Sequence, residues 1–328
     1  MDERLEQLHR WLRALWGDLE VDVRPASEDA SFRRYFRVSR PGEESLILMD
    51  APPDKEGLGP FVDICARLDR AGLHVPRVIE KDQQQGFLLL TDLGRTPYLS
   101  ALTPQNVDGL YRDALSALVE MQQITDLSGI PPYNEAQLRT EMDLFSDWFL
   151  PKHLGLDPVS YREDLAAVHN LLVANALAQP QVFVHRDYHS RNLMVCHPNP
   201  GILDFQDAMV GPVTYDLVSL LKDCYIQWGE AQIEDWVAGF LAAKQSRGQL
   251  AEVAMSDFRE WFDLMGLQRH MKAIGIFSRL NYRDGKPQYL NDIPRTLDYV
   301  QRVAAQHQAL LPLTELIESQ VIPRLNKS

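Results

Sequence analysis

One stretch of the chain, residues 181–207, constrains the fold more than any other, because polar side chains stand there between short apolar segments. The apolar segments 182–184, 193–195 and 202–203 predict three brief buried strands. Residues 197–201, His-Pro-Asn-Pro-Gly, predict a tight turn between the second and third strands. We therefore expect a rigid scaffold that presents polar residues at strand ends and in turns.

Three polar residues of this stretch, Asp187, Asn192 and Asp204, have the spacing of a phosphoryl-transfer site. Transfer from ATP needs one carboxylate at the acceptor hydroxyl, and an amide oxygen and a second carboxylate that hold Mg²⁺. The protein-kinase catalytic loop is written His-Arg-Asp, four residues and Asn, followed later by Asp-Phe-Gly. The chain reproduces the loop from His185 to Asn192 and the Asp-Phe pair at Asp204, with Gln206 in place of the glycine.

Ordinary structural roles are the alternative explanation for these residues. Asp187 could cap a turn, Asn192 could bridge a loop, and Asp204 could start a helix. Three independent spacings agree with the kinase loop, which favours the catalytic interpretation. We therefore predict that Asp187 is the catalytic residue and that Asn192 and Asp204 are the metal ligands.

With these motifs, the chain resembles the aminoglycoside phosphotransferase family, the small-molecule branch of the protein-kinase-like fold. Within that family it is most similar to the anomeric N-acetylmuramate/N-acetylglucosamine kinases of bacterial cell-wall recycling. The segments behind the closer resemblance are residues 29–38 (Asp-Ala-Ser-Phe-Arg-Arg-Tyr-Phe-Arg-Val), 49–53, 88–94 and 269–280. The resemblance runs along nearly the whole chain.

The resemblance implies an α+β, protein-kinase-like two-lobed fold. Residues 1–94 would form a small, β-rich N-lobe that binds the nucleotide. Residues 95–328 would form a large, mainly helical C-lobe with the catalytic loop, the metal site and a sugar-binding region. The activity implied is ATP- and Mg²⁺-dependent phosphorylation of the anomeric hydroxyl of N-acetylmuramate or N-acetylglucosamine. In the segment 215–221, Asp216 is expected to hydrogen-bond the backbone of the catalytic loop.

Composition and charge restrict the partners of the chain. Its 328 residues are 45% apolar and 24% charged, as in an ordinary globular protein. The net charge of −13 argues against nucleic acid, and no apolar run is long enough to predict a membrane span. The charged N-terminus lacks the apolar core of a signal peptide, and three widely spaced cysteines fit a reducing cytoplasm. We expect a cytoplasmic monomer whose partner is a small amino sugar, without nucleic acid or membrane.

The segment 21–38 predicts a strand, a turn and a strand, and its turn at 26–31 occupies the place of the loop that covers the phosphates in kinases. This turn has no glycine, but its small residues still allow backbone N–H groups to approach a phosphate. Ser31, Phe32 and Arg33 are therefore predicted to bind the nucleotide, with a simple hairpin as the alternative.

The strand expected at residues 45–49 lacks the phosphate-binding lysine of kinases, because it ends in Leu-Met-Asp at 48–50. Either Arg33, Arg34 or Lys55 supplies the positive charge at the phosphates, or Mg²⁺ neutralises more of the phosphate charge.

A buried strand is also expected at residues 87–90, directly before Asp92 and Leu93. In the family that the chain resembles, this place is the hinge whose backbone groups read adenine. Asp92 and Leu93 are therefore predicted to bind the nucleotide, and an ordinary exit from a strand is the alternative.

The region 269–295 reverses the charge balance of the chain, with six Lys or Arg residues and two acids. Its aromatic residues, whose rings suit a sugar, are Phe277, Tyr282 and Tyr289. Arg279 and Arg283, one helical turn apart with Tyr282 between them, are predicted to contact the sugar. His189 of the catalytic loop is predicted to orient the acceptor. A solvated helix face is the alternative for the whole region.

Two other functions compete with an amino-sugar kinase. An aminoglycoside kinase would need clustered carboxylates for its polycationic substrates, and the basic region argues against that. A catalytically weak, ATP-binding pseudokinase is favoured by the missing lysine and the glycine-free loop. The intact Asp187, Asn192 and Asp204 oppose this second alternative.

Overall fold

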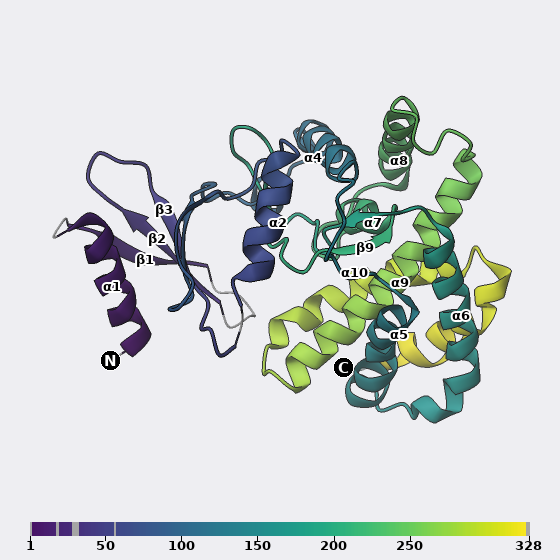
Figure 1. The fold of residues 1–328 in the computed structure, drawn as a ribbon. Coiled ribbons are helices and arrows are strands. Elements are labelled where there is room, and N and C mark those ends of the chain that lie inside the picture. The colour runs from purple at the N-terminus through teal and green to yellow at the C-terminus, as the bar shows by residue number, and fades with distance from the viewer. Residues whose placement is uncertain (1, 18–19, 28–32, 56, 326–328) are drawn as a thin grey trace. The chain divides into compact units, whose positions relative to one another are not determined.

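The computed structural model describes residues 2–17, 20–27, 33–55 and 57–325, and it divides into two compact units (Figure 1). Unit 1 comprises residues 1–101 and 193–207, and unit 2 comprises residues 102–192 and 208–328. The segment 193–207 thus groups with unit 1, although the sequence suggested a C-lobe that begins at residue 95. The assignment of nucleotide binding to residues 1–94 and of catalysis to residues 95–328 remains a prediction.

Unit 1 is built around a five-stranded antiparallel sheet in the order β1-β2-β3-β5-β4. Its strands are β1 (Asp22–Ser27), β2 (Arg34–Ser39), β3 (Leu46–Asp50), β4 (Val78–Asp82) and β5 (Phe87–Thr91). The register places Leu48 of β3 opposite Phe36 of β2 on one side and Leu89 of β5 on the other. The strands predicted at 21–38, 45–49 and 87–90 are confirmed.

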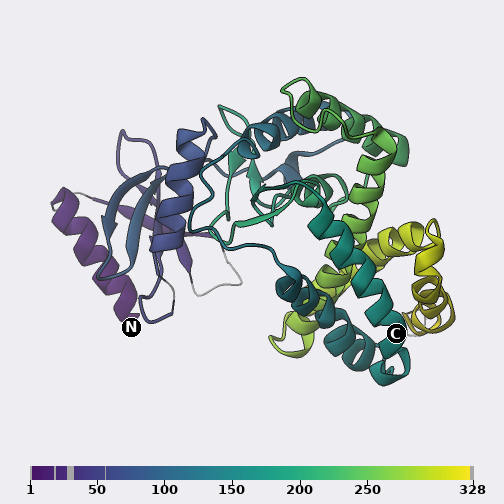
Figure 2. The same cartoon turned by 45° about the vertical axis from the view of Figure 1, so that its right-hand side comes forward.

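One helix covers each face of this sheet, α1 (Glu3–Trp16) and α2 (Gly59–Arg70), as Figures 1 and 2 show. Successive side chains of a strand point to opposite faces. In β5, Phe87 packs against Trp11 of α1 with the ring centroids 5.6 Å apart, whereas Leu88 is buried on the other face. The continuous apolar run of β5 is therefore explained by burial on both sides.

The predicted hairpin of the 181–207 stretch lies in unit 1, which also contains α3 (Tyr98–Ala101). Its strands, β7 (Leu193–Met194) and β8 (Gly201–Ile202), are shorter than the sequence suggested. Val195 instead donates its N–H to the carbonyl of Thr96 at 2.8 Å. Asp204 has a φ of +62°, which bends the chain away from the sheet direction soon after β8.

Unit 2 is mainly helical. Its helices are α4 (Val107–Met121), α5 (Glu135–Leu144), η1 (Phe145–His153), η2 (Pro158–Tyr161), α6 (Arg162–Ala178), α7 (Tyr215–Leu221), α8 (Glu230–Gln245), α9 (Met255–Tyr282), η3 (Pro287–Asp292), α10 (Ile293–Ala304), η4 (Gln308–Leu310), α11 (Leu311–Leu316), η5 (Ile317–Val321) and α12 (Ile322–Leu325). Two antiparallel strands, β6 (Gln181–Val184) and β9 (Met209–Pro212), frame the catalytic stretch. The 28-residue helix α9 contacts α5, α6, α7, α8, α10, η1 and η3, and so forms the centre of the unit.

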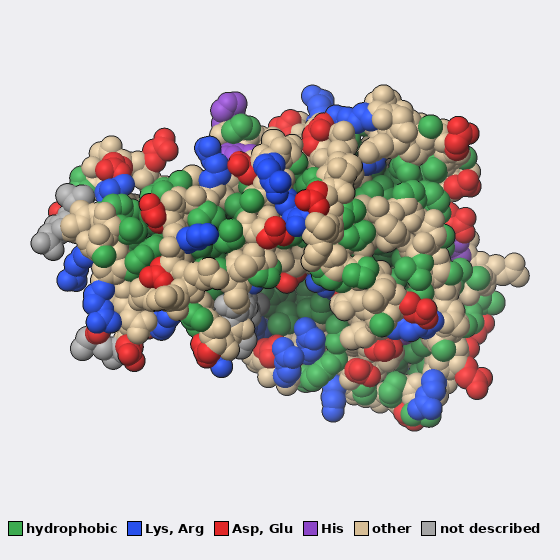
Figure 3. Space-filling model, viewed as in Figure 1, with side chains coloured by type: hydrophobic (Ala, Val, Ile, Leu, Met, Phe, Trp, Pro, Cys, Tyr) green, Lys and Arg blue, Asp and Glu red, His purple; other side chains and the backbone are tan. Residues whose placement is uncertain are grey.

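Charged side chains of both signs are interspersed over the face shown in Figure 3. This face has no large area of uniform positive charge of the kind that binds nucleic acid. Within the described ranges, no helix has the length and apolar character that a membrane crossing requires.

A glycine permits the close approach of two central helices in unit 2. A Cβ atom on Gly275 of α9 would lie 2.4 Å from the backbone carbonyl carbon of Leu144, at the end of α5. Side-chain rotation cannot relieve a clash with backbone. A Cβ on Gly266 of the same helix would meet Val218 at 3.5 Å, which is an ordinary van der Waals contact.

We expect Gly275→Ala to lower the free energy of unfolding by about 1–3 kcal/mol, because α5 and α9 must separate to admit the methyl group. Chemical denaturation monitored by circular dichroism measures this change. Gly266→Ala is the matched control, and it should retain or raise stability by up to about 1 kcal/mol because alanine favours the helix. Equal stabilities for the two variants would contradict the close approach.

Candidate active site

The predicted catalytic loop, His185–Asn192, follows β6 and is held at its start by Asp216. The Asp216 carboxylate, in the first turn of α7, accepts the N–H groups of His185 at 2.7 Å and of Arg186 at 2.9 Å. Burial raises the pKa of Asp216 to about 7, and the two N–H donors oppose that shift. Arg186 has a φ of +78°, a strained conformation for a residue with a side chain. The expected contact between Asp216 and the loop backbone is confirmed.

Asp187 is half-buried, and its carboxylate is ionised. Burial acts to raise its pKa, but the positive charges of Lys272 and other neighbouring cations outweigh burial and lower the pKa below its usual value. The side-chain amide of Asn192 donates to the carbonyl of Asp187 at 3.0 Å. The structure thus brings Asp187 and Asn192 together in one turn, with a carboxylate ready to accept a proton.

A buried network lies beneath the loop and is centred on Glu141 of α5. Its carboxylate accepts hydrogen bonds from Arg186 at 2.5 Å, Gln137 at 3.0 Å and the hydroxyl of Tyr133, and it forms an ion pair with Lys272 at 3.1 Å. Burial acts to raise the pKa of Glu141, but the charges of Lys272 and Arg186 lower it overall. Lys272 also donates to the hydroxyl of Tyr215 at 3.0 Å.

A second buried carboxylate, Asp223, holds the other end of the loop. One oxygen accepts the N–H of Ser190 at 3.0 Å and its hydroxyl at 2.5 Å, and the other accepts the N–H of Tyr225 at 2.9 Å. Between these contacts, the buried ring of His189 lies 5.3 Å from the Tyr225 ring. Burial lowers the pKa of His189, so its ring is neutral near pH 7. Its predicted role in orienting the acceptor stays a prediction.

Asp204 lies in unit 1, after the β7–β8 hairpin. The antiparallel pairing of Leu193 with Ile202 makes the chain enter and leave the hairpin at the same end. Asp204 accepts a hydrogen bond from the amide of Gln206 at 2.7 Å, and its positive φ is a second strained conformation. Phe205 is fully buried, with its ring 5.0 Å from that of Phe61 on α2, which anchors the Asp-Phe pair.

The donor atoms available at these residues suit Mg²⁺. Mg²⁺ prefers oxygen ligands, keeps several waters, and in nucleotide sites takes only one or two protein ligands beside the phosphates. Asn192 donates its amide nitrogen to the Asp187 carbonyl, and its amide oxygen is an atom of the type that Mg²⁺ prefers. In the parts of the chain that are described, no three His, Cys, Asp or Glu residues form a metal cage. Asn192 of unit 2 and Asp204 of unit 1 thus each carry an oxygen of the type that Mg²⁺ prefers, and their role as metal ligands stays a prediction.

Of the residues predicted to contact the phosphates, Ser31 and Phe32 lie outside the described residues, and Arg33 is partly buried just before β2. The position of the missing lysine, Met49, is fully buried in the sheet. Arg34 pairs instead with Asp50, whose carboxylate it contacts at 2.6 Å and whose other oxygen is bound by Arg4 of α1. Arg34 therefore ties β2 to β3 and α1.

The predicted hinge is held by the carboxylate of Asp92. This group accepts hydrogen bonds from Arg37 at 2.9 Å, from the hydroxyl of Ser45 at 2.6 Å and from the N–H of Gly94 at 2.9 Å. Leu93 is buried. Since the Asp92 side chain is engaged within unit 1, the nucleotide contacts predicted for Asp92 and Leu93 would come from their backbone groups.

The predicted sugar-contacting residues Arg279, Tyr282 and Arg283 lie at the C-terminal end of α9. Arg283 follows the last helical residue, is exposed and pairs with Asp284 at 2.7 Å. The hydroxyl of Tyr282 lies 3.2 Å from the ring nitrogen of His153 on η1. These contacts place the group toward η1, and its role in sugar binding stays a prediction.

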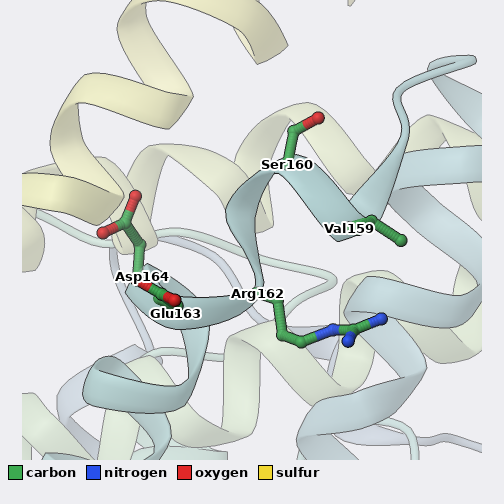
Figure 4. Close-up of a pocket in the computed structure, with 5 residues that line it drawn as sticks. All are labelled: Val159, Ser160, Arg162, Glu163 and Asp164. Carbon is green, nitrogen blue, oxygen red and sulfur yellow. The ribbon is translucent and has the colours of Figure 1, made fainter.

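The depression drawn in Figure 4 lies elsewhere in unit 2, at the turn from η2 into α6. It is lined by Val159, Ser160, Arg162, Glu163 and Asp164. None of the predicted site residues borders it. We therefore do not associate this depression with catalysis.

Sequence reasoning missed the buried supports of the loop, namely Tyr133, Glu141, Tyr215 and Asp223. Each is an isolated polar residue in a helical or irregular segment, and only their tertiary contacts reveal them. Tyr215 and Lys272 lay in segments that the sequence had singled out, 215–221 and the basic region that begins at residue 269, but without this supporting role.

A model of the phosphotransferase enzyme family matches residues 22–253. The chain belongs to this family. Among curated relatives, the proteins named N-acetylmuramate/N-acetylglucosamine kinase from Pseudomonas aeruginosa and Neisseria meningitidis serogroup B are 46% and 38% identical to it. The first alignment covers 97% of this chain and 97% of the relative, and the second covers 96% and 95%.

Solved structures agree with this membership. An aminoglycoside phosphotransferase with bound ADP matches with a TM-score of 0.61 at 15% identity, over 91% of this chain and 98% of that chain. A choline kinase from Streptococcus pneumoniae matches with a TM-score of 0.63 at 11% identity, over 91% and 99%. At such identities the likeness shows the fold alone. It confirms the predicted protein-kinase-like α+β fold, with a β-rich N-terminal part and a mainly helical remainder.

We expect Lys272→Met to move the acidic limb of the pH profile of kcat/KM for phosphoryl transfer to higher pH. Removing this cation withdraws the charge that lowers the Asp187 pKa, so the carboxylate protonates at a higher pH than in the wild type. Lys272→Arg should keep the wild-type limb. Lys244→Met is the matched control, because Lys244 is a buried lysine on α8 outside this network. A uniform loss at all pH values would assign Lys272 a purely structural role.

Proposed function

We propose that the protein is an ATP- and Mg²⁺-dependent kinase that phosphorylates the anomeric hydroxyl of N-acetylmuramate and N-acetylglucosamine during peptidoglycan recycling. The observation that carries the proposal is similarity over nearly the full length to several relatives that bear this kinase name. The loop geometry supports it, because an ionised Asp187 and the amide of Asn192 share one hydrogen-bonded turn. We expect the protein to act in the cytoplasm.

In this proposal Asp187 accepts or orients the proton of the acceptor hydroxyl. Lys272 and Glu141 act through it, since they set its charge environment and hold Arg186 beside it. Phosphoryl transfer depends mainly on positioning and on stabilisation of charge. A loop held by three buried carboxylates, Asp216, Glu141 and Asp223, provides that rigidity.

Asn192 and Asp204 would hold the metal, which when bound neutralises charge on the nucleotide phosphates. The nucleotide itself would lie against unit 1, with the backbone of Asp92 and Leu93 at the adenine. Ser31, Phe32 and Arg33 would lie at the phosphates. Arg33 is our preferred source of the positive charge that Met49 does not supply, because it follows the turn predicted to lie at the phosphates.

The aminoglycoside kinase alternative is disfavoured by the charges around Asp187. The groups that act on its carboxylate are Lys272, His189, Arg269 and Arg186, which are basic residues. A polycationic acceptor would be repelled by the charged members of this set.

The test is a transfer assay with labelled ATP, Mg²⁺ and, separately, N-acetylmuramate, N-acetylglucosamine and an aminoglycoside. We expect both amino sugars to be converted to 1-phosphates, which chromatography separates from ATP. In Asp187→Asn, turnover should fall by about 10²–10⁴-fold while ATP binding persists, because only the acceptor's proton loses its partner. Transfer to the aminoglycoside alone, or ATP binding without any transfer, would refute the proposal, and a near wild-type rate in Asp187→Asn would remove this residue from the mechanism.

Asp204→Ala should lose Mg²⁺-dependent ATP binding and activity together, because a carboxylate on the metal acts on nucleotide affinity and chemistry alike. Calorimetric titration with ATP, in the presence and absence of Mg²⁺, measures the effect. Glu80→Ala, an exposed carboxylate on β4 of the same unit, is the control. Unchanged Mg·ATP affinity together with normal activity would show that Asp204 is not a metal ligand.

A further inference from the structure

An exposed arginine next to Asn192, the predicted metal ligand, is stacked on aromatic rings and forms no ion pair within the described residues. The Cζ atom of Arg191 lies 3.5 Å from the centroid of the Tyr225 ring and 5.8 Å from that of Tyr289. Among residues 2–17, 20–27, 33–55 and 57–325, none forms an ion pair or a side-chain hydrogen bond with the Arg191 guanidinium. Stacking occupies one face of the group and leaves its N–H donors at the edges.

The rings beneath Arg191 form a contiguous cluster, here named the aromatic shelf, which consists of the buried Phe277 and the partly exposed Tyr225 and Tyr289. Phe277 of α9 stacks on Tyr289 of η3 with the centroids 5.9 Å apart, and it lies 6.2 Å from Tyr225. Asp223 binds the N–H of Tyr225 and also the N–H and hydroxyl of Ser190, the residue before Arg191. The shelf and the catalytic loop are therefore fixed to one buried carboxylate.

The charge of Arg191 acts on one acidic side chain of the neighbouring helix, Asp292, and the charge of Arg295 does so too. Asp292, at the end of η3, pairs with Arg295 at 3.1 Å. The arginine on the shelf thus keeps its capacity to bind an anion from solution, in a unit where other arginines such as Arg186 and Arg259 are paired with carboxylates.

We propose that Arg191, stacked on Tyr225, binds the lactyl carboxylate of N-acetylmuramate, and that the exposed part of the aromatic shelf receives the sugar ring. The inference rests on the proposed function, and it names the residues that distinguish the acidic sugar from N-acetylglucosamine. A guanidinium matches a carboxylate with two parallel hydrogen bonds. The C–H face of a pyranose ring is apolar and packs on aromatic faces.

This assignment uses only part of the basic region 269–295 that the sequence singled out. Phe277 and Tyr289 contribute to the shelf, but the arginine comes from the catalytic loop. Arg279 lies in the last turn of α9, and Arg283, which follows the helix, is paired with Asp284. If Arg191 binds the carboxylate, its replacement weakens the use of N-acetylmuramate and replacement of Arg283 does not. If Arg279 and Arg283 bind it, the reverse holds.

The test compares kcat/KM for N-acetylmuramate and N-acetylglucosamine in the wild type and in Arg191→Ala, Arg191→Gln and Arg191→Lys. We expect the alanine and glutamine variants to lose about 10- to 100-fold toward N-acetylmuramate, the range of a charge-assisted hydrogen bond, with N-acetylglucosamine nearly unaffected. The lysine variant should lose less, because it keeps the charge without the bidentate geometry. Arg112→Ala, an exposed arginine on α4, is the control for loss of one positive charge.

A second measurement replaces the substrate's carboxylate by a neutral amide. The wild type should lose efficiency with the amide by the same factor as Arg191→Ala loses with the acid, and Arg191→Ala should treat acid and amide alike. Equal losses of Arg191→Ala for both natural sugars would place Arg191 at the phosphates or in the loop's structure and overturn the inference. A selective loss in Arg283→Ala, with none in Arg191→Ala, would also overturn it. A wild-type protein that phosphorylates neither sugar would refute the proposed function itself.

Discussion

The buried carboxylate of Glu141 is the interaction on which the geometry of the catalytic loop depends. An ionised group in a protein interior is tolerated only when partners replace its hydration, and removing one partner typically costs about 3–5 kcal/mol. Glu141 obtains Arg186 from the loop and Lys272 from α9, while α5 carries the acid itself. Three segments distant in the chain are thereby held in one arrangement. Lys272, which pairs with Glu141, also lowers the pKa of Asp187. One positive charge therefore contributes both to the packing beneath the loop and to the ionisation of the predicted catalytic residue.

In unit 1, buried carboxylates paired with arginines join the helix α1 to the strands of the sheet. Asp50 is fully buried at the end of β3 and is paired with Arg4 of α1 and Arg34 of β2. Asp92 repeats this arrangement at the predicted hinge, where Arg37 and Ser45 donate hydrogen bonds to it. At the strand position where a kinase carries its lysine, this chain has the apolar Met49, and the neighbouring charges serve to join helix, sheet and hinge.

How far the sequence predicted the molecule depended on the range of each interaction. The catalytic loop was recognisable because Asp187 and Asn192 belong to one short segment with fixed spacing, and α1 because its apolar positions repeat at helical intervals. The pairing of Glu141 with Lys272 could not be recognised from the sequence, since these residues are distant in the chain and neither has a local signature. Arg279 and Arg283 were paired by helical spacing, and the structure keeps that spacing, since Arg283 follows α9 and donates its N–H to the carbonyl of Arg279. Arg191 was overlooked because its aromatic partner comes from a separate turn.

The discontinuity of unit 1 bears on how the chain acquires its structure during synthesis. The chain completes the five-stranded sheet by residue 91, yet the hairpin 193–207, whose strand β8 donates an N–H to the carbonyl of His74, emerges from the ribosome only after residues 102–192. Unit 1 therefore remains incomplete while residues 102–192, more than a quarter of the chain, are synthesised. No single cleavage point yields either unit whole, and a fragment that ends at residue 101 would expose the apolar surface on which the hairpin normally lies.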